Sequence, residues 1–253
     1  MAALADWPFP LMCAHRGGGK LAPENTLAAF RLGAEFGYCM FEFDTKLSGD
    51  GCAILMHDDT LERTTDARGR VAQLSLADVM RLDAGSWHSA TYAGEGVPTL
   101  WRLCQWIVAN DFFANIEIKP CAGREFETGA AVAQEADLLF RNADIAPVLS
   151  SFSESALEGA REAAPDLPRA LLCSQIQPDW LARCRALDCV AIDPHHASID
   201  EDFIEQAHDS GLRVLTYTVN DPVRAAQLRS WGIDTIITDA INEISAADYD
   251  HLK

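Results

Sequence analysis

The sequence predicts an α/β fold, a (β/α)8 TIM barrel. Short apolar runs alternate with helical patterns from one end of the chain to the other, and eight of the runs have the length of strands. The 253 residues are 49% hydrophobic, which is enough for one large core. A doubly wound open sheet is the alternative for the same alternation. The expected strands are 11–14, 40–44, 113–119, 148–151, 170–173, 190–193, 214–218 and 235–238.

One further run, 53–57, interrupts the alternation. Only about five residues, 47–51, separate it from the strand before it, which is too few for a parallel crossover. We therefore expect an antiparallel hairpin, with its turn in Ser48-Gly49-Asp50-Gly51.

The segment from about 58 to 98 is rich in Gly, Asp, Arg and Thr, with one helical pattern at 76–82. We expect it to be a small insert over the mouth of the barrel that leads into a helix at 100–109. The whole chain, 1–253, is expected to form a single catalytic domain with this insert.

The helical pattern that follows the first strand spans 26–36. Asn25 has the residue type of an N-cap, and Gly37 has that of a C-terminal stop. These signals predict one helix bounded by the two residues.

Charge and composition exclude several classes of function. The formal net charge of -18 disfavours nucleic acid and anionic membranes as partners. No run is long enough to span a bilayer and the first residues lack a basic, apolar leader pattern, so the expected location is the cytoplasm. The eight cysteines form no C-x-x-C pair, which argues against a zinc site.

Two of the expected strands combine apolar and charged residues in strict alternation. In one, Glu42 and Asp44 alternate with phenylalanines; in the other, Glu117 and Lys119 alternate with isoleucines. Because successive side chains of a strand point to opposite faces, each strand presents two charged groups to one face. Three acids facing one lysine are too costly to bury without further compensation.

A divalent cation would provide that compensation. Glu42, Asp44 and Glu117 offer the oxygen ligands that Mg²⁺ and Ca²⁺ prefer. An ion-pair network among these acids, Arg16 and Lys119 is the alternative.

The remaining candidates lie at the ends of strands, where barrel active sites gather. His15 and His57 are suited to proton transfer because imidazole titrates near neutral pH. Arg16 and Lys119 are suited to holding phosphate. The chain has no G-x-S-x-G, P-loop or G-x-G-x-x-G pattern, which disfavours serine hydrolases, kinases and dehydrogenases.

Taken in order, these motifs resemble the glycerophosphodiester phosphodiesterases, and the resemblance covers nearly the whole chain. The string from His15 to Phe30 is most similar to the bacterial cytosolic members associated with uptake of glycerol 3-phosphate. The matching segments are His15-Arg16-Gly17, Pro23-Glu24-Asn25-Thr26, Glu42-x-Asp44, Asp50-Gly51, His57-Asp58, Leu61-x-Arg63-Thr64-Thr65, Leu82-Asp83-Ala84-Gly85-Ser86-Trp87, Pro98-Thr99-Leu100, Glu117-Ile118-Lys119, Tyr217-Thr218-Val219-Asn220 and Gly232-Ile233-Asp234-Thr235-Ile236-Ile237-Thr238-Asp239.

The resemblance implies hydrolysis of a small glycerophosphodiester to sn-glycerol 3-phosphate and an alcohol, with one divalent cation, Mg²⁺ or Ca²⁺. It implies His15 and His57 as the acid and base, in either order, and the three acids as metal ligands. Many members carry Trp at the position of Tyr217, which implies that Tyr217 forms a wall of the substrate pocket.

Two other functions are compatible with the same residues. One is a phospholipase-type phosphodiesterase with a lipid substrate, although no amphipathic membrane segment is present to support it. The other is a protein that binds glycerophosphodiesters without cleaving them.

Overall fold

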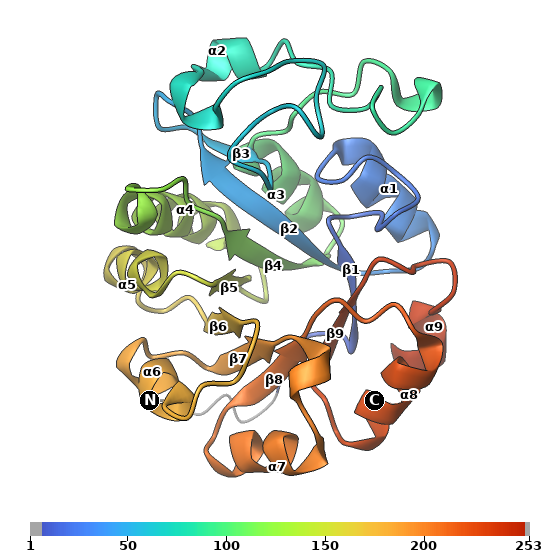
Figure 1. Cartoon of the computed structure of the whole chain (residues 1–253), viewed down its shortest axis with the longest axis vertical. Coiled ribbons are helices and arrows are strands. Elements are labelled where there is room, and N and C mark those ends of the chain that lie inside the picture. Colours follow the sequence, from blue (N-terminus) through green and yellow to red (C-terminus); the bar gives the residue numbers. More distant parts are fainter. Residues whose placement is uncertain (1–6, 251–253) are drawn as a thin grey trace.

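Eight parallel strands form a closed ring, with helices around its outside (Figure 1). The computed structural model describes residues 7–250, without the side chains of the last two. In the ring, strand follows strand in the order β1-β9-β8-β7-β6-β5-β4-β2, and pairing of β1 with β2 closes it. This closure confirms the predicted barrel and excludes the open sheet. The ring strands are β1 Met12–His15, β2 Met40–Leu47, β4 Phe113–Ile118, β5 Val148–Ser151, β6 Arg169–Cys173, β7 Ala191–Pro194, β8 Arg213–Thr216 and β9 Thr235–Thr238.

The helices cover the outer face of the ring (Figure 1). Their bounds are α1 Leu27–Glu35, α2 Leu76–Val79, α3 Leu100–Ala109, α4 Glu125–Phe140, α5 Glu154–Ala163, α6 Trp180–Ala186, α7 Glu201–Asp209, α8 Pro222–Ser230 and α9 Ala246–Asp250, with 3₁₀ turns at Val71–Gln73, Ala90–Tyr92 and His196–Ser198.

The expected hairpin is confirmed. Strand β3, Ala53–Leu55, pairs antiparallel with the last residues of β2, outside the ring. This pairing extends β2 to Leu47, three residues beyond the predicted end, so that Glu42 and Asp44 lie within the strand rather than at its end. The extension is possible because Lys46, although buried, binds Asp59 at 2.7 Å and the carbonyl oxygen of Lys119 at 2.9 Å.

The predicted start of α1 is wrong by one residue. Thr26, not Asn25, is the N-cap, and its side chain accepts a hydrogen bond from the N–H of Ala29. Asn25 has a φ of +59° and directs its side chain elsewhere. Gly37, with a φ of +85°, follows the end of the helix as predicted.

Two apolar clusters form the core, one outside the ring of strands and one inside it. The larger one lies between the ring and the helices and contains the outward-facing Phe41 and Phe43 of β2. The smaller one lies inside the ring toward the amino ends of the strands, where Trp7 and Phe9 pack against Met40. The inside of the ring is therefore apolar at one end, and the charged residues gather at the other.

Residues 58–98, which include α2, lie beside the barrel at the top of Figure 1, and not over its mouth as expected. They have a small apolar cluster of their own, in which Leu61, Val71 and Val79 are buried together with residues of the β3 region. The predicted helix at 76–82 is only four residues long as a regular α-helix.

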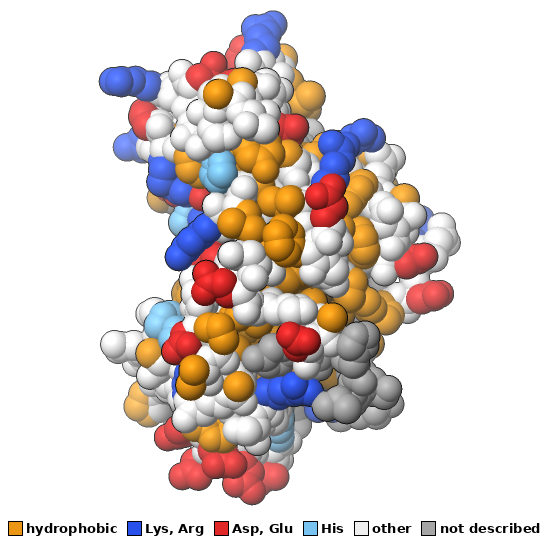
Figure 2. All heavy atoms as spheres, turned by 90° about the vertical axis from the view of Figure 1, so that its right-hand side faces the viewer, with side chains coloured by type: hydrophobic (Ala, Val, Ile, Leu, Met, Phe, Trp, Pro, Cys, Tyr) orange, Lys and Arg blue, Asp and Glu red, His pale blue; other side chains and the backbone are white. Residues whose placement is uncertain are grey.

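The surface agrees with the acidic composition. Figure 2 views the side that faces right in Figure 1 and shows hydrophobic side chains spread along its middle and acidic ones gathered at its lower end, where α7 lies. Within residues 7–250, no helix has both the length and the apolar character needed to cross a bilayer. Residues 1–6, on which the expected lack of a leader partly rests, lie outside the described residues.

Candidate active site

Three buried carboxyl groups meet inside the ring. Glu42 and Asp44 point inward from β2 because Phe41 and Phe43 point outward, and β4 brings Glu117 beside them through the register pair of Asp44 with Glu117. Each of the three offers an oxygen that lies within 4.8 Å of the oxygens of the other two. The carboxyl cluster, as we call Glu42, Asp44 and Glu117, is thus produced by strand alternation and register.

Two cations only partly neutralise the carboxyl cluster. Arg16 Nε lies 3.1 Å from Asp44 Oδ2, and Lys119 Nζ lies 2.8 Å from Glu117 Oε1 and 3.7 Å from Asp44 Oδ1. Burial opposes ionisation of Asp44, but Arg16, His57 and Lys119 outweigh it and lower its pKa to about 2. Both an ion-pair network and an acid cluster are therefore present.

The pKa values of Glu42 and Glu117 are shifted in the opposite direction, upward. Burial raises the pKa of Glu42 well above its ordinary value, and the charges of Asp44 and Glu117 raise it further. Burial and Asp44 also raise the pKa of Glu117, against the attraction of Lys119. Arg16 and Lys119 therefore do not fully compensate the negative charges of the two glutamates.

The residues present fit a hard divalent cation. Glu42 Oε1 and Asp44 Oδ1 are buried and have no hydrogen-bond partner among the described residues. Buried carboxylate oxygens without partners are costly, and a cation bound by the three carboxylates would satisfy them. With oxygen donors only, the cluster suits Mg²⁺ or Ca²⁺ better than zinc.

The loop after β1 supports the cluster from one side. Arg16 has a φ of +51°, which turns its backbone N–H to within 3.2 Å of Glu42 Oε2. Asn25 donates to Asp44 Oδ2 at 2.8 Å, and its own Oδ1 accepts from the N–H of Asp44 at 3.2 Å. Both residues adopt the sparsely populated left-handed conformation, as is common where a backbone is held for function.

His15, at the end of β1, faces the cluster and is held from behind. Its Nδ1 lies 2.6 Å from Asp239 Oδ1, while its Nε2 lies 3.6 Å from Glu42 Oε2. Burial opposes ionisation of Asp239, but its bonds to His15 and Asn220 lower its pKa, so it accepts the proton of Nδ1. This fixes the ring with Nε2 toward the pocket.

His57, two residues after β3, is oriented in the same way. Its Nδ1 lies 2.7 Å from Asp58 Oδ1, and Arg63 holds Asp58 with a bond of 2.7 Å from Nε. That bond keeps the pKa of Asp58 well below its usual range. Burial lowers the pKa of His57, and Arg16 and Lys119 lower it further against the pull of Asp44.

These side chains line one pocket of about 210 Å³ at the carboxyl ends of the strands. Tyr217 forms part of its wall, where its hydroxyl donates to the carbonyl oxygen of Cys173 and its ring contacts Phe152 edge-on. Seven of the eight predicted site residues line this pocket, and Asp44 lies beneath it, bonded to Arg16. The described residues that line it are His15, Arg16, Glu42, His57, Asn115, Glu117, Lys119, Ser150, Phe152, Leu172, Asp193, Tyr217, Thr218 and Ile237.

The sequence interpretation missed several partners. Asp239 and Asp58 orient the two histidines, and Asn25 orients Asp44. Asp58 follows His57 directly and Asp239 follows β9, so the rule that polar residues at strand ends gather at one rim could have found both. Asn25 gave no such signal, because its type also suits an N-cap.

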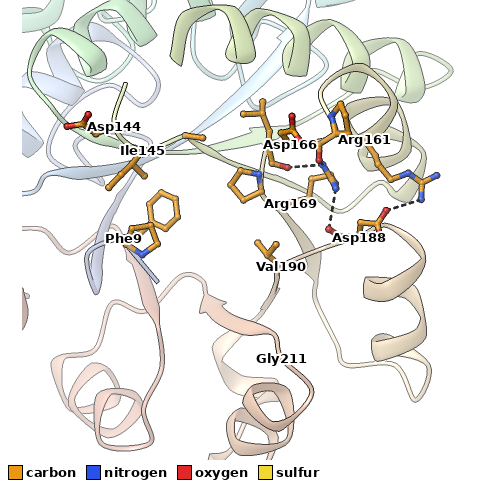
Figure 3. A pocket seen from close by; sticks show the side chains of 14 residues that line it. Phe9, Asp144, Ile145, Arg161, Asp166, Arg169, Asp188, Val190 and Gly211 are labelled. Carbon is orange, nitrogen blue, oxygen red and sulfur yellow. Dashed lines mark hydrogen bonds and ion pairs between the residues drawn. The ribbon is translucent and has the colours of Figure 1, made fainter. Parts of the chain in front are cut away.

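A larger cavity, of about 750 Å³, lies at the opposite end of the barrel, before the amino ends of β5 to β8 (Figure 3). There Arg169 donates hydrogen bonds to main-chain carbonyl oxygens, among them that of Asp188. The side-chain carboxylate of Asp188 lies 4.0 Å from Arg161. Of the described residues that line this cavity, none is a predicted site residue. Although this cavity is larger than the pocket at the carboxyl ends of the strands, it is not the candidate active site.

Sequence comparison gives the same assignment. The profile of the glycerophosphoryl diester phosphodiesterase family matches residues 15–243. A glycerophosphodiester phosphodiesterase of Caldanaerobacter subterraneus is 32% identical over 231 residues, which cover 90% of this chain and 93% of the relative.

Solved structures agree. An Oleispira antarctica phosphodiesterase, in complex with the product sn-glycerol-3-phosphate, superposes with a TM-score of 0.88 at 36% identity and covers 95% of this chain and 97% of its own. The glycerophosphodiester phosphodiesterase of Agrobacterium tumefaciens superposes with a TM-score of 0.79 at 26% identity, over 94% of this chain and 100% of its own. The match over almost the whole chain confirms the resemblance seen in the motifs, and the chain belongs to the glycerophosphoryl diester phosphodiesterase family.

Proposed function

We propose that the protein hydrolyses small glycerophosphodiesters to sn-glycerol 3-phosphate and an alcohol, with His15 and His57 as acid and base. The observation that carries the proposal is that both imidazoles, each with a carboxylate at Nδ1, line the pocket formed over the carboxyl cluster. The product bound by the Oleispira antarctica relative supports the substrate class.

Arg16 and Lys119 hold the phosphate of the substrate. Both line the pocket, and both now pair with acids that a bound cation would neutralise. Their positive charges stabilise the negative charge that builds up on the phosphate oxygens in the transition state. Glu42, Asp44 and Glu117 would hold the divalent cation, which when bound draws charge from the phosphate and acidifies a nearby hydroxyl group.

Two proton transfers accompany cleavage of the diester. One histidine takes the proton of the attacking hydroxyl group through Nε2 as the new P–O bond forms. The other gives a proton to the alcohol oxygen as the old P–O bond breaks. Where the attacking hydroxyl group belongs to the glycerol, cleavage leaves a cyclic phosphate, and a water molecule opens it to sn-glycerol 3-phosphate in a second pair of proton transfers. Asp239 and Asp58 keep each Nδ1 protonated, so that each Nε2 remains available for transfer.

The test is an assay of the purified protein with glycerophosphocholine. Release of glycerol 3-phosphate should stop after treatment with a chelator and return on addition of Mg²⁺ or Ca²⁺ alone, each titrated separately. Binding of the diester without turnover under every cation would support a binding protein and contradict the proposal.

A parallel assay separates small substrates from lipids. The protein should cleave glycerophosphocholine and leave phosphatidylcholine vesicles intact at equal concentrations of diester. Preferential cleavage of the vesicles would instead support the phospholipase-type reaction. The cytoplasmic location remains a prediction, as does the absence of nucleic acid and stable membrane partners.

A further inference from the structure

Asp193 is an acid of the pocket that the reaction proposed above does not use. It lies on β7, which is directly across the ring from β2, four strands away in either direction. Its side chain lines the pocket, yet the residue is fully buried. It is therefore part of the floor on the side opposite Glu42 and Asp44.

Neither oxygen of Asp193 has a hydrogen-bond partner among the described residues. The hydroxyl of Tyr217, which lines the same side of the pocket, is already directed to the carbonyl oxygen of Cys173. Burial raises the pKa of Asp193 well above its ordinary value, and the charge of Glu117 raises it further. Buried polar groups are nearly always satisfied, so two unpaired oxygens on a residue that lines a pocket point to a ligand.

Asp193 is separate from the carboxyl cluster. The set of acid oxygens that lie within 4.8 Å of one another consists of Glu42, Asp44 and Glu117 and does not include Asp193. No lysine or arginine within residues 7–250 forms an ion pair with it. The two oxygens of a carboxyl group accept hydrogen bonds, and a protonated carboxyl group also donates one, so a hydroxyl group complements either form.

The direction of the substrate identifies which hydroxyl group this is. In the reaction proposed above, Arg16 and Lys119 hold the phosphate from the β1 and β4 side, and the alcohol, which differs between diesters, needs the open mouth of the pocket. The glycerol, which all these diesters share, is left to extend toward the buried wall that contains Leu172 and Asp193.

We propose that Asp193 binds the terminal hydroxyl group of the glycerol moiety, the one farthest from the phosphate, and thereby selects glycerophosphodiesters. The inference rests on the proposed function and adds a residue that determines specificity.

The experiment combines a protein variant with a substrate analogue. Glycerophosphocholine is compared with the phosphocholine diester of propane-1,2-diol, which lacks only the terminal hydroxyl group. The wild-type protein should lose about 10-fold to 100-fold in kcat/KM on the analogue, as expected for one buried hydrogen bond. Asp193→Leu should lose a similar factor on glycerophosphocholine and little more on the analogue, because the partner is already gone.

Asp193→Asn is the conservative variant. Its amide keeps a donor and an acceptor, so kcat/KM for glycerophosphocholine should lie between the values for wild type and Asp193→Leu. Because both substitutions remove an unpaired buried carboxyl group, thermal unfolding should occur at the same or a higher temperature. Asp234→Asn is the matched control. The Asp234 carboxyl group binds His208 and Arg213 at the amino end of β9, away from the pocket, so its loss should lower Tm without changing the ratio of kcat/KM between the two substrates.

Three results would overturn the inference. One is an equal loss on both substrates in Asp193→Leu with a lowered Tm, which indicates a structural role. Another is a changed ratio between glycerophosphocholine and glycerophosphoethanolamine, which would assign Asp193 to the leaving alcohol. The third is wild-type cleavage of the analogue at the full rate. Failure of the wild-type protein to cleave either diester is a different outcome, because it refutes the proposed function itself.

If Asp193→Leu does not fold, Asp193→Asn provides the same comparison between the two substrates.

Discussion

At the scale of single residues, the two histidines are distinguished by what lies behind them. His15 has Asp239 at Nδ1 and His57 has Asp58, so each ring is fixed in one orientation through its Nδ1. His195 also lies after a strand, but its Nδ1 accepts a hydrogen bond from the main chain of Ala197 instead. An ionised partner at Nδ1 is the feature that separates the candidate catalytic histidines from that one.

Replacing either His15 or His57 by Ala should lower kcat by about 100-fold to 10,000-fold, the usual contribution of general acid-base catalysis. Steady-state assays at saturating Mg²⁺ measure this, and circular dichroism should show an unchanged fold. His208→Ala is the control, because His208 pairs with Asp234 outside the pocket. Near-normal turnover in both pocket variants would refute the assignment.

Glu42→Gln should raise the Mg²⁺ concentration needed for half-maximal activity. The substitution keeps the size of the side chain but removes a charged ligand from the carboxyl cluster. Loss of an outer partner alone changes metal affinity by about 10-fold to 100-fold, so the shift should exceed tenfold, with activity partly recovered at high Mg²⁺.

Glu205→Gln, on the exposed face of α7, is the matched control for this titration and should leave it unchanged. If the Mg²⁺ dependence of Glu42→Gln equals that of the control, Glu42 is not a ligand.

At the scale of elements, the loop between β1 and α1 brings the site together through backbone conformations that few residues adopt. Gly19 has a φ of +55°, and a Cβ there would lie 2.0 Å from the carbonyl oxygen of Asp239. Close approach of this loop to the end of β9 is what places Asp239 behind His15. Gly19 is therefore needed for the packing of this loop against the end of β9.

Gly19→Ala should destabilise the protein by more than about 1 kcal/mol and lower kcat, because both the conformation and the space exclude a side chain. Gly37→Ala is the matched control: its φ of +85° is similarly unfavourable, but nothing lies within 4 Å of its Cβ position. Urea unfolding of both variants measures the difference, and a loss at Gly37 equal to that at Gly19 would mean that the close approach to Asp239 contributes nothing.

The bounds of helices and strands were predicted correctly where the local sequence determines them. The helix at 100–109 and the strands at 148–151 and 235–238 have the expected bounds. The prediction failed for Asn25, because its side chain binds Asp44 across the structure instead of capping α1. The prediction also ended β2 too early, at Asp44. Lys46 is buried in this strand because β2 pairs with β3, and the local sequence does not show that pairing.

At the scale of the whole molecule, the cation and the fold are coupled through the buried acids. In protein without the cation, the raised pKa values of Glu42 and Glu117 mean that their contribution to stability is present below the ordinary value of 4.5 and is lost as pH rises through the raised values. Asp44, lowered to about 2, contributes stability above its ordinary value of 3.8 that is lost as pH falls toward 2.

The increase in Tm caused by Mg²⁺, relative to protein in chelator, should therefore be small at about pH 4.5 and grow as pH rises above that value, as the glutamates ionise and bind the cation. Calorimetry across this range measures the increment. In Glu42→Gln the slope should be reduced. An increment that does not depend on pH, or that falls as pH rises, would contradict binding by these carboxyl groups.

The sequence by itself determined the α/β class, the barrel and, through its ordered motifs, the family. It also identified seven of the fourteen described residues that line the pocket, because strand periodicity and the position of polar residues at strand ends are local properties of the chain. Only the tertiary structure decided which acids stand behind which histidine, that Asn25 serves Asp44, and that Asp193 faces the pocket with no partner. These features depend on closure of the ring, which places β9 beside β1 and β7 across from β2, and no local pattern records which strands become neighbours.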